Sequence, residues 1–253
     1  MKKTLVIVSF GTSVPQAEKS IRAVEQALMQ EASGWEFARA YTSPTIRGIL
    51  AKRGQPVPSL EELLEQLAAQ GEQEIFVQPT HVLYGIEYDK IRDSVEAFAP
   101  RFAKIRLGRP LLSGTEDLKE MADCISANCM PEEGALVLMG HGTDHLINMT
   151  YPAMQTALRM QGEDRAFVGT VSCWPTIEDV LEQLKKEGFR KVTLMPLMLV
   201  AGEHARSDMS GPQPDSWKSI LEAAGIEVHC RLEGMGEMAC VQEMYRRHLR
   251  EEL

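Results

Sequence analysis

The stretch LEELLEQLAAQGEQEIFVQP, Leu60–Pro79, is repeated in the second half of the chain as IEDVLEQLKKEGFRKVTLMP, Ile177–Pro196. The two stretches align without gaps at an offset of 117 residues, and seven of the 20 positions are identical. In each, apolar residues recur at helical spacing up to a glycine, Gly71 or Gly188, and a short apolar run follows. Because glycine is a common helix stop, both stretches predict a helix followed by a buried strand.

Two further matches flank this repeat. LVIVSFGT at Leu5–Thr12 resembles LVLMGHGT at Leu136–Thr143, and YTSPT at Tyr41–Thr45 resembles SCWPT at Ser172–Thr176, both at an offset of 131. The change from 131 to 117 is explained by 14 additional residues, 46–59, in the first half. Three collinear matches with one insertion indicate an internal duplication, in which Tyr41 corresponds to Ser172.

Each half reads as four strands alternating with helices. Ser13 and Gln16 have the spacing of a capping box at the start of the first helix. Alternating strands and helices predict right-handed crossovers and parallel sheets. We therefore predict an α/β fold of two similar halves, 1–130 and 131–253, each a parallel sheet flanked by helices, with an active-site cleft between them. The strand candidates are apolar runs typical of strands buried on both faces, at 4–9, 36–42, 74–83, 103–108, 135–140, 166–172, 191–200 and 226–231.

The composition excludes several classes of protein. The chain has 253 residues with 44% apolar and 25% charged residues, as in ordinary globular proteins. No apolar run approaches the ~20 residues of a membrane helix. The N-terminal apolar run resembles a short signal peptide, but we interpret it as the first strand, 4–9, because its counterpart lies in mid-chain. A net charge of −9 argues against general nucleic-acid binding. The five cysteines include no C-x-x-C pair, so neither a structural zinc site nor a redox couple is expected, and we predict a cytoplasmic protein.

The duplication places corresponding residues beyond the carboxyl ends of the strands, where parallel α/β sheets bind their ligands. Phe10 corresponds to His141, and Glu87 corresponds to His204. We expect His141, His204 and Glu87 to line the cleft. Unprotonated imidazole is a proton acceptor near neutral pH and a ligand for borderline divalent ions such as cobalt, nickel, iron and zinc.

Other signals are weaker or absent. His145 is interpreted equally well as a metal-handling residue or as a surface histidine at a helix start, and His81 as a packed histidine within a strand. The sequence contains no P-loop and no G-x-G-x-x-G after a first strand, so ATP and dinucleotide binding by these motifs is not expected. It also contains no recognisable nucleophile elbow.

With these residues, the chain resembles the class II chelatases, and within them the duplicated sirohydrochlorin cobaltochelatases of the anaerobic pathway. The run LMPLMLVAGEHA at Leu194–Ala205 is highly specific, whereas Gly-His-Gly alone is not. The resemblance runs nearly end to end and also rests on Val8–Ser13, Gly85–Ile91, Met139–Gly142, Asp208–Met209 and Asp215–Lys218.

The resemblance implies a lyase-class enzyme that inserts Co2+ into sirohydrochlorin without ATP, with no permanent cofactor, nucleic acid or membrane partner. It implies metal binding by His141 and His204, proton acceptance by His141, and an acidic side chain, Glu87, facing the macrocycle. Phe10, Thr12 and Ser172 are expected to contact the bound tetrapyrrole. A homo-oligomer is left open. The candidate cations for the substrate's carboxylates are Arg47, Lys52, Arg53, Lys90, Arg92 and Arg206.

One position departs from the family pattern. Family members commonly carry an acidic residue, a potential third metal ligand, where this chain has Ser172. Water, or Cys173 as a thiolate, would then complete the shell, or the metal would bind more weakly. Insertion of iron or nickel stays open, because histidine ligands do not distinguish these ions sharply. A non-catalytic carrier of tetrapyrrole or metal also stays open, because two α/β lobes with a cleft are a ligand-clamp architecture. A metal-dependent hydrolase using His141, His145 and His204 ranks last.

Overall fold

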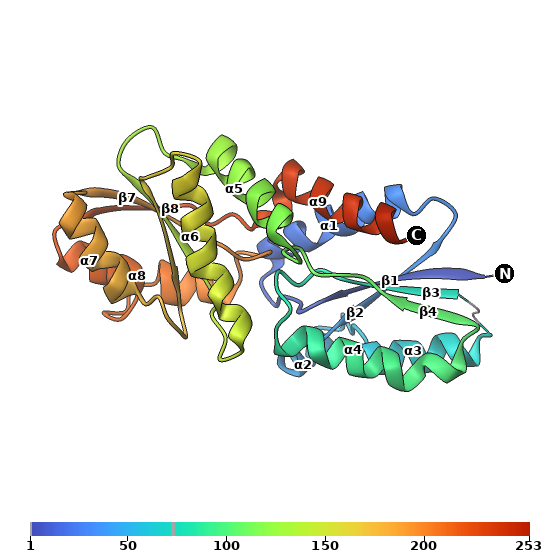
Figure 1. Cartoon of the computed structure of the whole chain (residues 1–253). Coiled ribbons are helices and arrows are strands. Elements are labelled where there is room, and N and C mark those ends of the chain that lie inside the picture. The colour runs from blue at the N-terminus through green and yellow to red at the C-terminus, as the bar shows by residue number, and fades with distance from the viewer. Residues whose placement is uncertain (1, 72–73) are drawn as a thin grey trace. The chain divides into compact units, whose positions relative to one another are not determined.

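A computed structural model describes residues 2–71 and 74–253, so Glu72 and Gln73 of the repeat lie outside the described residues. The chain divides into two compact units (Figure 1). Unit 1 comprises residues 1–113 and 236–253, and unit 2 comprises residues 114–235. Among the described residues, no helix is long and apolar enough to cross a membrane.

Unit 1 contains a four-stranded parallel sheet of order β2-β1-β3-β4. The central strands β1 and β3 are almost wholly buried, because both faces of the sheet are covered. The strands are β1 (Lys3–Ser9), β2 (Glu36–Tyr41), β3 (Glu74–Pro79) and β4 (Lys104–Leu107). The helices are η1 (Pro15–Ala17), α1 (Glu18–Glu31), α2 (Pro44–Lys52), α3 (Leu60–Ala69), α4 (Ile86–Phe98), η2 (Ala99–Arg101) and α9 (Ala239–Glu252).

The helices of unit 1 form a layer on each side of its sheet. In Figure 1, α2, α3 and α4 lie on one side, and α1 and α9 lie together on the other. Successive strand residues point to opposite faces. Val6 and Val8 of β1 accordingly pack in one cluster with Leu64 of α3 and Ile91 of α4.

Unit 2 repeats this plan with a four-stranded parallel sheet of order β6-β5-β7-β8. Its core joins Val137 and Met139 of β5 to Val180 of α7, Trp217 of α8 and Met209 of η4. The strands are β5 (Ala135–Gly140), β6 (Ala166–Thr170), β7 (Lys191–Pro196) and β8 (Glu227–Cys230). The helices are α5 (Thr115–Cys129), η3 (Leu146–Met149), α6 (Thr150–Met160), α7 (Ile177–Glu187), η4 (Ala205–Met209) and α8 (Trp217–Ala223), and η5 (Met235–Glu237) lies at the junction.

The predicted fold class, with two similar parallel sheets flanked by helices, is confirmed. Backbone hydrogen bonds also repeat between the units: Thr80 N donates to Val8 O, and Leu197 N donates to Met139 O. These contacts reproduce the offsets of 117 and 131. The additional residues 46–59 contribute most of α2, a helix that the sequence analysis did not predict.

Two local predictions were wrong. The first helical turn begins after Val14 without a side-chain cap, so Ser13 and Gln16 form no capping box. The strand register also changes one correspondence. Tyr41 pairs with Ser9 in unit 1, as Thr170 pairs with Gly140 in unit 2. Thr170, and not Ser172, is therefore the structural counterpart of Tyr41.

The compact units divide the chain differently from the halves predicted at 130/131. Helix α5 ends the first half of the sequence, yet it belongs to unit 2, where it packs against α6. Helix α9 ends the second half, yet it belongs to unit 1, where it packs against α1. The buried side chains of α9 on this face include Val241, Met244 and Tyr245. Each sheet is thus completed by a helix that follows the other sheet in the sequence.

Candidate metal and substrate site

His141 lies directly after β5, between two glycines that the packing requires. A Cβ atom on Gly140 would overlap the ring of Tyr151. Gly142 has a φ of +84°, and its Cβ would lie 3.0 Å from the Cβ of Thr170. Glycine adopts such a left-handed conformation without steric cost. The Gly-His-Gly sequence therefore lets the loop turn tightly and leaves the imidazole of His141 exposed at the edge of the sheet.

His204 directly precedes η4, a single turn of π-helix that follows β7 in the chain. Such short π-helical turns are rare and frequently occur at functional sites. The His204 Nδ1 atom lies 2.5 Å from Oδ2 of Asp208, one turn further along. The His204 side chain is 47% exposed. Asp208 thus fixes the orientation of an imidazole that otherwise faces solvent.

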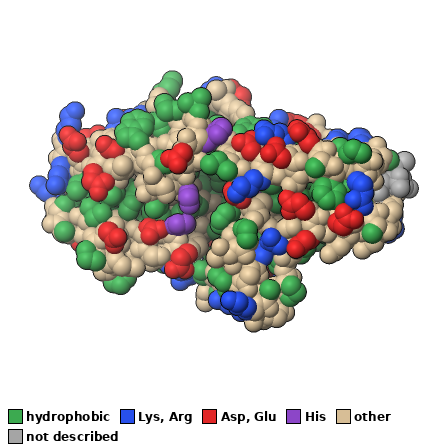
Figure 2. Space-filling model, turned by 90° about the horizontal axis from the view of Figure 1, so that it is seen from below, with side chains coloured by type: hydrophobic (Ala, Val, Ile, Leu, Met, Phe, Trp, Pro, Cys, Tyr) green, Lys and Arg blue, Asp and Glu red, His purple; other side chains and the backbone are tan. Residues whose placement is uncertain are grey.

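The structure brings the two predicted metal ligands together. The ring centroids of His141 and His204 lie 4.7 Å apart with an interplanar angle of 87°. His141 Nδ1 lies 2.9 Å from the carbonyl oxygen of Gly142. Because carbonyl and carboxylate oxygens accept hydrogen bonds, each Nδ1 is the donor, and in a neutral imidazole the Nε2 atom is then left with the lone pair. Figure 2 shows several histidine side chains at the surface on the face drawn.

Ser172 lies beside this pair. Its backbone N–H donates to the carbonyl oxygen of His141 at 3.1 Å. Ser172 and Asp208 line the same pocket, which has a volume of about 450 Å³ and also includes Ser207, Gln213 and Asp215. Ser172 is therefore linked to His141 through the backbone and shares a pocket with Asp208, the partner of His204.

Cys173 and His145 make contacts that differ from metal ligation. The Sγ atom of Cys173 lies 3.7 Å from Oδ1 of Asp144. Burial raises the pKa of the Cys173 thiol, and the charge of Asp144 raises it further. Cys173 is therefore a thiol whose Sγ contacts Asp144, and its part in a metal shell stays a prediction. His145 Nδ1 accepts a hydrogen bond from Ile147 N at 3.2 Å, so this histidine caps η3.

Glu87 is the second residue of α4, at the position in unit 1 that His204 holds in unit 2. Lys90 Nζ lies 2.5 Å from Glu87 Oε1. Burial raises the pKa of Glu87, but the hydrogen bond and the charge of Lys90, together with further effects of Thr42 and His81, hold it below the ordinary value. Glu87 is therefore an ionised carboxylate at neutral pH.

Phe10 and Thr12 follow β1 in unit 1. The Phe10 side chain is 49% exposed, although it is large and apolar. Thr12 is buried, and its Oγ1 accepts from Val14 N at 3.2 Å. Thr143 Oγ1 accepts from His145 N at the same distance in unit 2. The Thr12 hydroxyl thus stabilises a turn common to both units, and contact of Phe10 and Thr12 with a tetrapyrrole stays a prediction.

His81 was placed in the wrong element. Strand β3 ends at Pro79, so His81 lies in the following loop and not within a strand. Both of its ring nitrogens are shielded from solvent and have no hydrogen-bond partner among the described residues. Burial lowers the pKa of His81 to about 4, against a smaller opposing effect of Glu87. His81 is therefore a neutral imidazole near neutral pH.

Most of the candidate cations already have partners. Arg47 and Arg92 form ion pairs with Glu62 and Asp89, at 3.0 and 2.8 Å. Arg53 donates to the carbonyl oxygen of Ser13 at 2.6 Å. Lys90 is paired with Glu87, as described above. Lys52 and Arg206 are exposed.

The sequence analysis missed the role of Asp208. This residue follows His204 by four positions, a spacing that brings side chains together on a helix. The spacing of His204 and Asp208 is visible in the sequence, but it indicates a contact only if a helical turn begins at His204. Within residues 2–71 and 74–253, no group of three or more histidine, cysteine, aspartate and glutamate side chains is arranged to hold a metal ion.

Among solved structures, the fold is similar to that of the sirohydrochlorin chelatase SirB. SirB from Bacillus subtilis with Fe3+ matches with a TM-score of 0.68 at 19% identity, covering 99% of this chain and 95% of that one. SirB from Bacillus subtilis subspecies spizizenii in complex with cobalt matches with a TM-score of 0.66 at 17% identity, with the same coverage.

Sequence comparison defines the family. Residues 3–253 match the family described as Cobalt chelatase (CbiK). The sirohydrochlorin cobaltochelatase of Salmonella typhimurium is 38% identical over 100% of this chain and 97% of its own length. The sirohydrochlorin cobaltochelatase CbiKC of Nitratidesulfovibrio vulgaris is 31% identical over 98% and 89%. The chain belongs to the CbiK cobalt chelatase family.

Proposed function

We propose that this chain is a lyase-class, cytoplasmic enzyme that inserts Co2+ into sirohydrochlorin without ATP. The observation that carries the assignment to particular residues is the pair of imidazoles, His141 and His204, with centroids 4.7 Å apart. Both rings have Nδ1 engaged and Nε2 available. Cobalt as the metal and sirohydrochlorin as the macrocycle are inferred from the names of the family and of the two relatives.

The two Nε2 atoms hold the incoming ion. Imidazole nitrogen suits borderline divalent ions such as Co2+. A nitrogen of each ring binds an ion at about 2 Å, and the remaining coordination positions are left to water and then to pyrrole nitrogens. Two neutral ligands hold the ion more loosely than a closed cage of four. Such binding suits an ion that has to be transferred to the substrate.

Insertion of a divalent ion displaces two pyrrole N–H protons from the macrocycle. Once the ion has moved to the pyrrole nitrogens, His141 Nε2 recovers its lone pair and accepts one proton as a general base. Its Nδ1–H stays hydrogen-bonded to the Gly142 carbonyl. The ionised carboxylate of Glu87 accepts the second proton and passes it to water. The enzyme's part is to position the reactants and to receive protons.

The proposal is tested by an anaerobic absorbance time course of sirohydrochlorin with substoichiometric enzyme, offered Co2+, Ni2+ and Fe2+ in turn. We expect many turnovers without nucleotide, fastest with Co2+. His141→Ala and His204→Ala should abolish turnover, whereas His229→Ala, an exposed histidine on β8, should retain it. A spectral change that stops at one equivalent would instead identify a carrier, and a wild-type rate in either histidine variant would refute the site.

Ser172 provides a test of the metal shell. The backbone N–H of Ser172 is hydrogen-bonded to the carbonyl oxygen of His141, and Ser172 shares the pocket with Asp208. We therefore expect Ser172→Glu to add a carboxylate ligand and to tighten Co2+ binding about tenfold, equivalent to about 1.4 kcal/mol. Calorimetric titration of the metal-free protein measures this change, with Ser172→Gln as the uncharged control. Equal affinities in the two variants would contradict the placement of Ser172.

A further inference from the structure

An apolar surface in unit 2 is formed by side chains of the loops that follow β5 and β6. Its three members, Leu146, Met149 and Trp174, have exposed fractions of 82%, 56% and 55%. We call them the apolar platform. Large apolar side chains gathered at the surface are unfavourable in water, and such patches commonly mark binding sites.

Backbone geometry places the members of the apolar platform together. Leu146 and Met149 are three residues apart on η3, a 3-10 helix, in which side chains at this spacing lie above one another. Asn148 joins this turn to the Trp174 loop, because its Nδ2 donates to the Trp174 carbonyl oxygen at 2.6 Å. Its Oδ1 accepts from Thr143 N at 3.1 Å.

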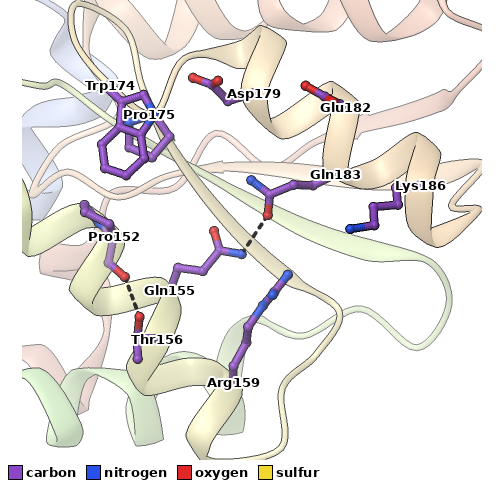
Figure 3. Close-up of a pocket in the computed structure, with 10 residues that line it drawn as sticks. All are labelled: Pro152, Gln155, Thr156, Arg159, Trp174, Pro175, Asp179, Glu182, Gln183 and Lys186. Carbon is purple, nitrogen blue, oxygen red and sulfur yellow. Dashed lines mark hydrogen bonds between the residues drawn. The ribbon is translucent and has the colours of Figure 1, made fainter.

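The same two loops carry the residues of the metal site. One loop begins at His141 after β5, and the other contains Ser172 after β6. The hydrogen bond from Ser172 N to His141 O connects them near the strand ends. In Figure 3, Trp174 lies with Pro152 and Pro175 at one end of a pocket of about 400 Å³. The apolar platform therefore lies on the two loops that follow the carboxyl ends of β5 and β6, the edge at which α/β proteins bind small molecules.

We infer that the apolar platform binds an apolar face or edge of the tetrapyrrole substrate next to the metal-bearing imidazoles. This inference rests on the proposed function. A large aromatic side chain buries 150–250 Å² at most, so three side chains supply a few hundred Å², well below the roughly 800 Å² that each partner buries in a stable protein interface. Small-molecule sites, in contrast, are lined mainly by apolar and aromatic side chains.

The test measures the dissociation constant of metal-free sirohydrochlorin by equilibrium titration, together with the steady-state constants for the macrocycle and for Co2+. In the double variant Leu146→Ser/Met149→Ser, we expect the dissociation constant and the KM for sirohydrochlorin to rise about tenfold, equivalent to about 1.4 kcal/mol. The KM for Co2+ should stay within about twofold. Trp174→Ser should behave likewise, and Trp174→Phe, which keeps an apolar ring, should restore most of the binding.

Met160 supplies the matched control. It lies at the end of α6 in the same unit, and its side chain is 84% exposed. Met160→Ser should leave the dissociation constant within about twofold of wild type. Unchanged macrocycle binding in the double variant, or equal losses in the double variant and in Met160→Ser, would overturn the inference.

A change in the molar mass of the protein in the double variant, measured by light scattering, would also overturn the inference, because the apolar platform would then be a subunit interface. Failure of the proposed function gives a different result. Wild-type enzyme would then bind sirohydrochlorin without turning it over, and the binding titration would still report on the apolar platform.

Discussion

Asp208 determines which nitrogen of His204 is available to a metal ion. Carboxylates that accept the second N–H of a ligating histidine fix its tautomer and raise its basicity, and their loss typically costs 10–100-fold in metal affinity. Asp208→Asn keeps an acceptor oxygen but removes the charge. We therefore expect Co2+ affinity and the rate of metallation to fall about tenfold or more.

Co2+ titration followed by visible absorbance measures this loss. Asp215→Asn is the matched control, because Asp215 lines the same pocket but is not a hydrogen-bond partner of either histidine within the described part of the chain. We expect the Co2+ affinity of this variant to stay within about twofold of wild type. Equal effects of the two variants would show that Asp208 contributes only general negative charge.

The lowered pKa of His81 leads to a prediction about how the free energy of unfolding depends on pH. Its pKa is about 4 in the folded protein against 6.5 ordinarily, so below pH 6.5 the unfolded chain binds a proton that the folded one does not. The free energy of unfolding therefore falls as the pH decreases from about 6.5 to about 4, by up to about 3 kcal/mol. His81→Gln should remove this part of the pH dependence.

Urea unfolding of wild type and His81→Gln across this pH range measures the difference between the two. Between pH 7 and pH 4.5, the free energy of unfolding should fall by more in wild type than in His81→Gln, because the variant has lost the acid-dependent penalty. Two curves that run parallel throughout would show that His81 titrates normally.

The sequence predicted the two histidines because the duplication and the ligand edge of the sheet point to the same positions. It could not predict the Asp208 contact, which depends on the π-helical turn that begins after His204. The correspondence of Tyr41 with Ser172 was wrong by two residues, because an ungapped alignment contains no information on strand register. Hydrogen bonds show that Ser172 corresponds to Ser43: each donates its N–H to the carbonyl oxygen of the residue after the first strand, His141 or Phe10.

At the scale of elements, helix caps offer a direct comparison. Ser59 and Glu62 form a complete capping box at the start of α3, whereas Ser13 makes no side-chain cap. Loss of such a cap costs typically about 1 kcal/mol. We expect Ser59→Ala to lower the free energy of unfolding by about this amount, and Ser13→Ala to leave it nearly unchanged. Denaturant unfolding measures both, and equal losses would contradict the assignment of the caps.

The strands were predicted better than the helices. All eight predicted strands are present, because buried parallel strands read as short apolar runs between polar segments. Their carboxyl ends were set too late, as at β3 and β7, because the apolar run continues into the loop that forms the ligand edge. Helix α2 was missed because residues 46–59 have no counterpart in the second half and contain a Gly-Gln-Pro-Val-Pro loop.

At the scale of the whole molecule, the exchange of α5 and α9 predicts which fragments fold. Residues 114–235 contain a complete sheet with its helices, so this fragment should unfold cooperatively and retain Co2+ binding by His141 and His204. Residues 1–113 lack α9, whose Val241, Met244, Tyr245 and Leu249 are fully buried. Each such side chain contributes about 1.5–3 kcal/mol.

The fragment 1–113 should therefore remain unfolded alone and fold when residues 236–253 are joined to it by a flexible linker. Circular dichroism and thermal melting of the three fragments measure this. Independent folding of 1–113 would show that α9 is dispensable for unit 1.

The placement of α9 also has a consequence for biosynthesis. Multidomain chains generally fold from the N-terminus as they leave the ribosome. In this chain, the sheet of unit 1 leaves the ribosome first, but its helix α9 follows only after some 140 further residues have been translated. This translation takes on the order of 10 s. During that interval α1 has no covering partner, whereas unit 2 is complete as soon as residue 235 is exposed. Unit 2 is therefore expected to complete its fold first. Until α9 is translated, unit 1 exposes apolar surface to which chaperones can bind.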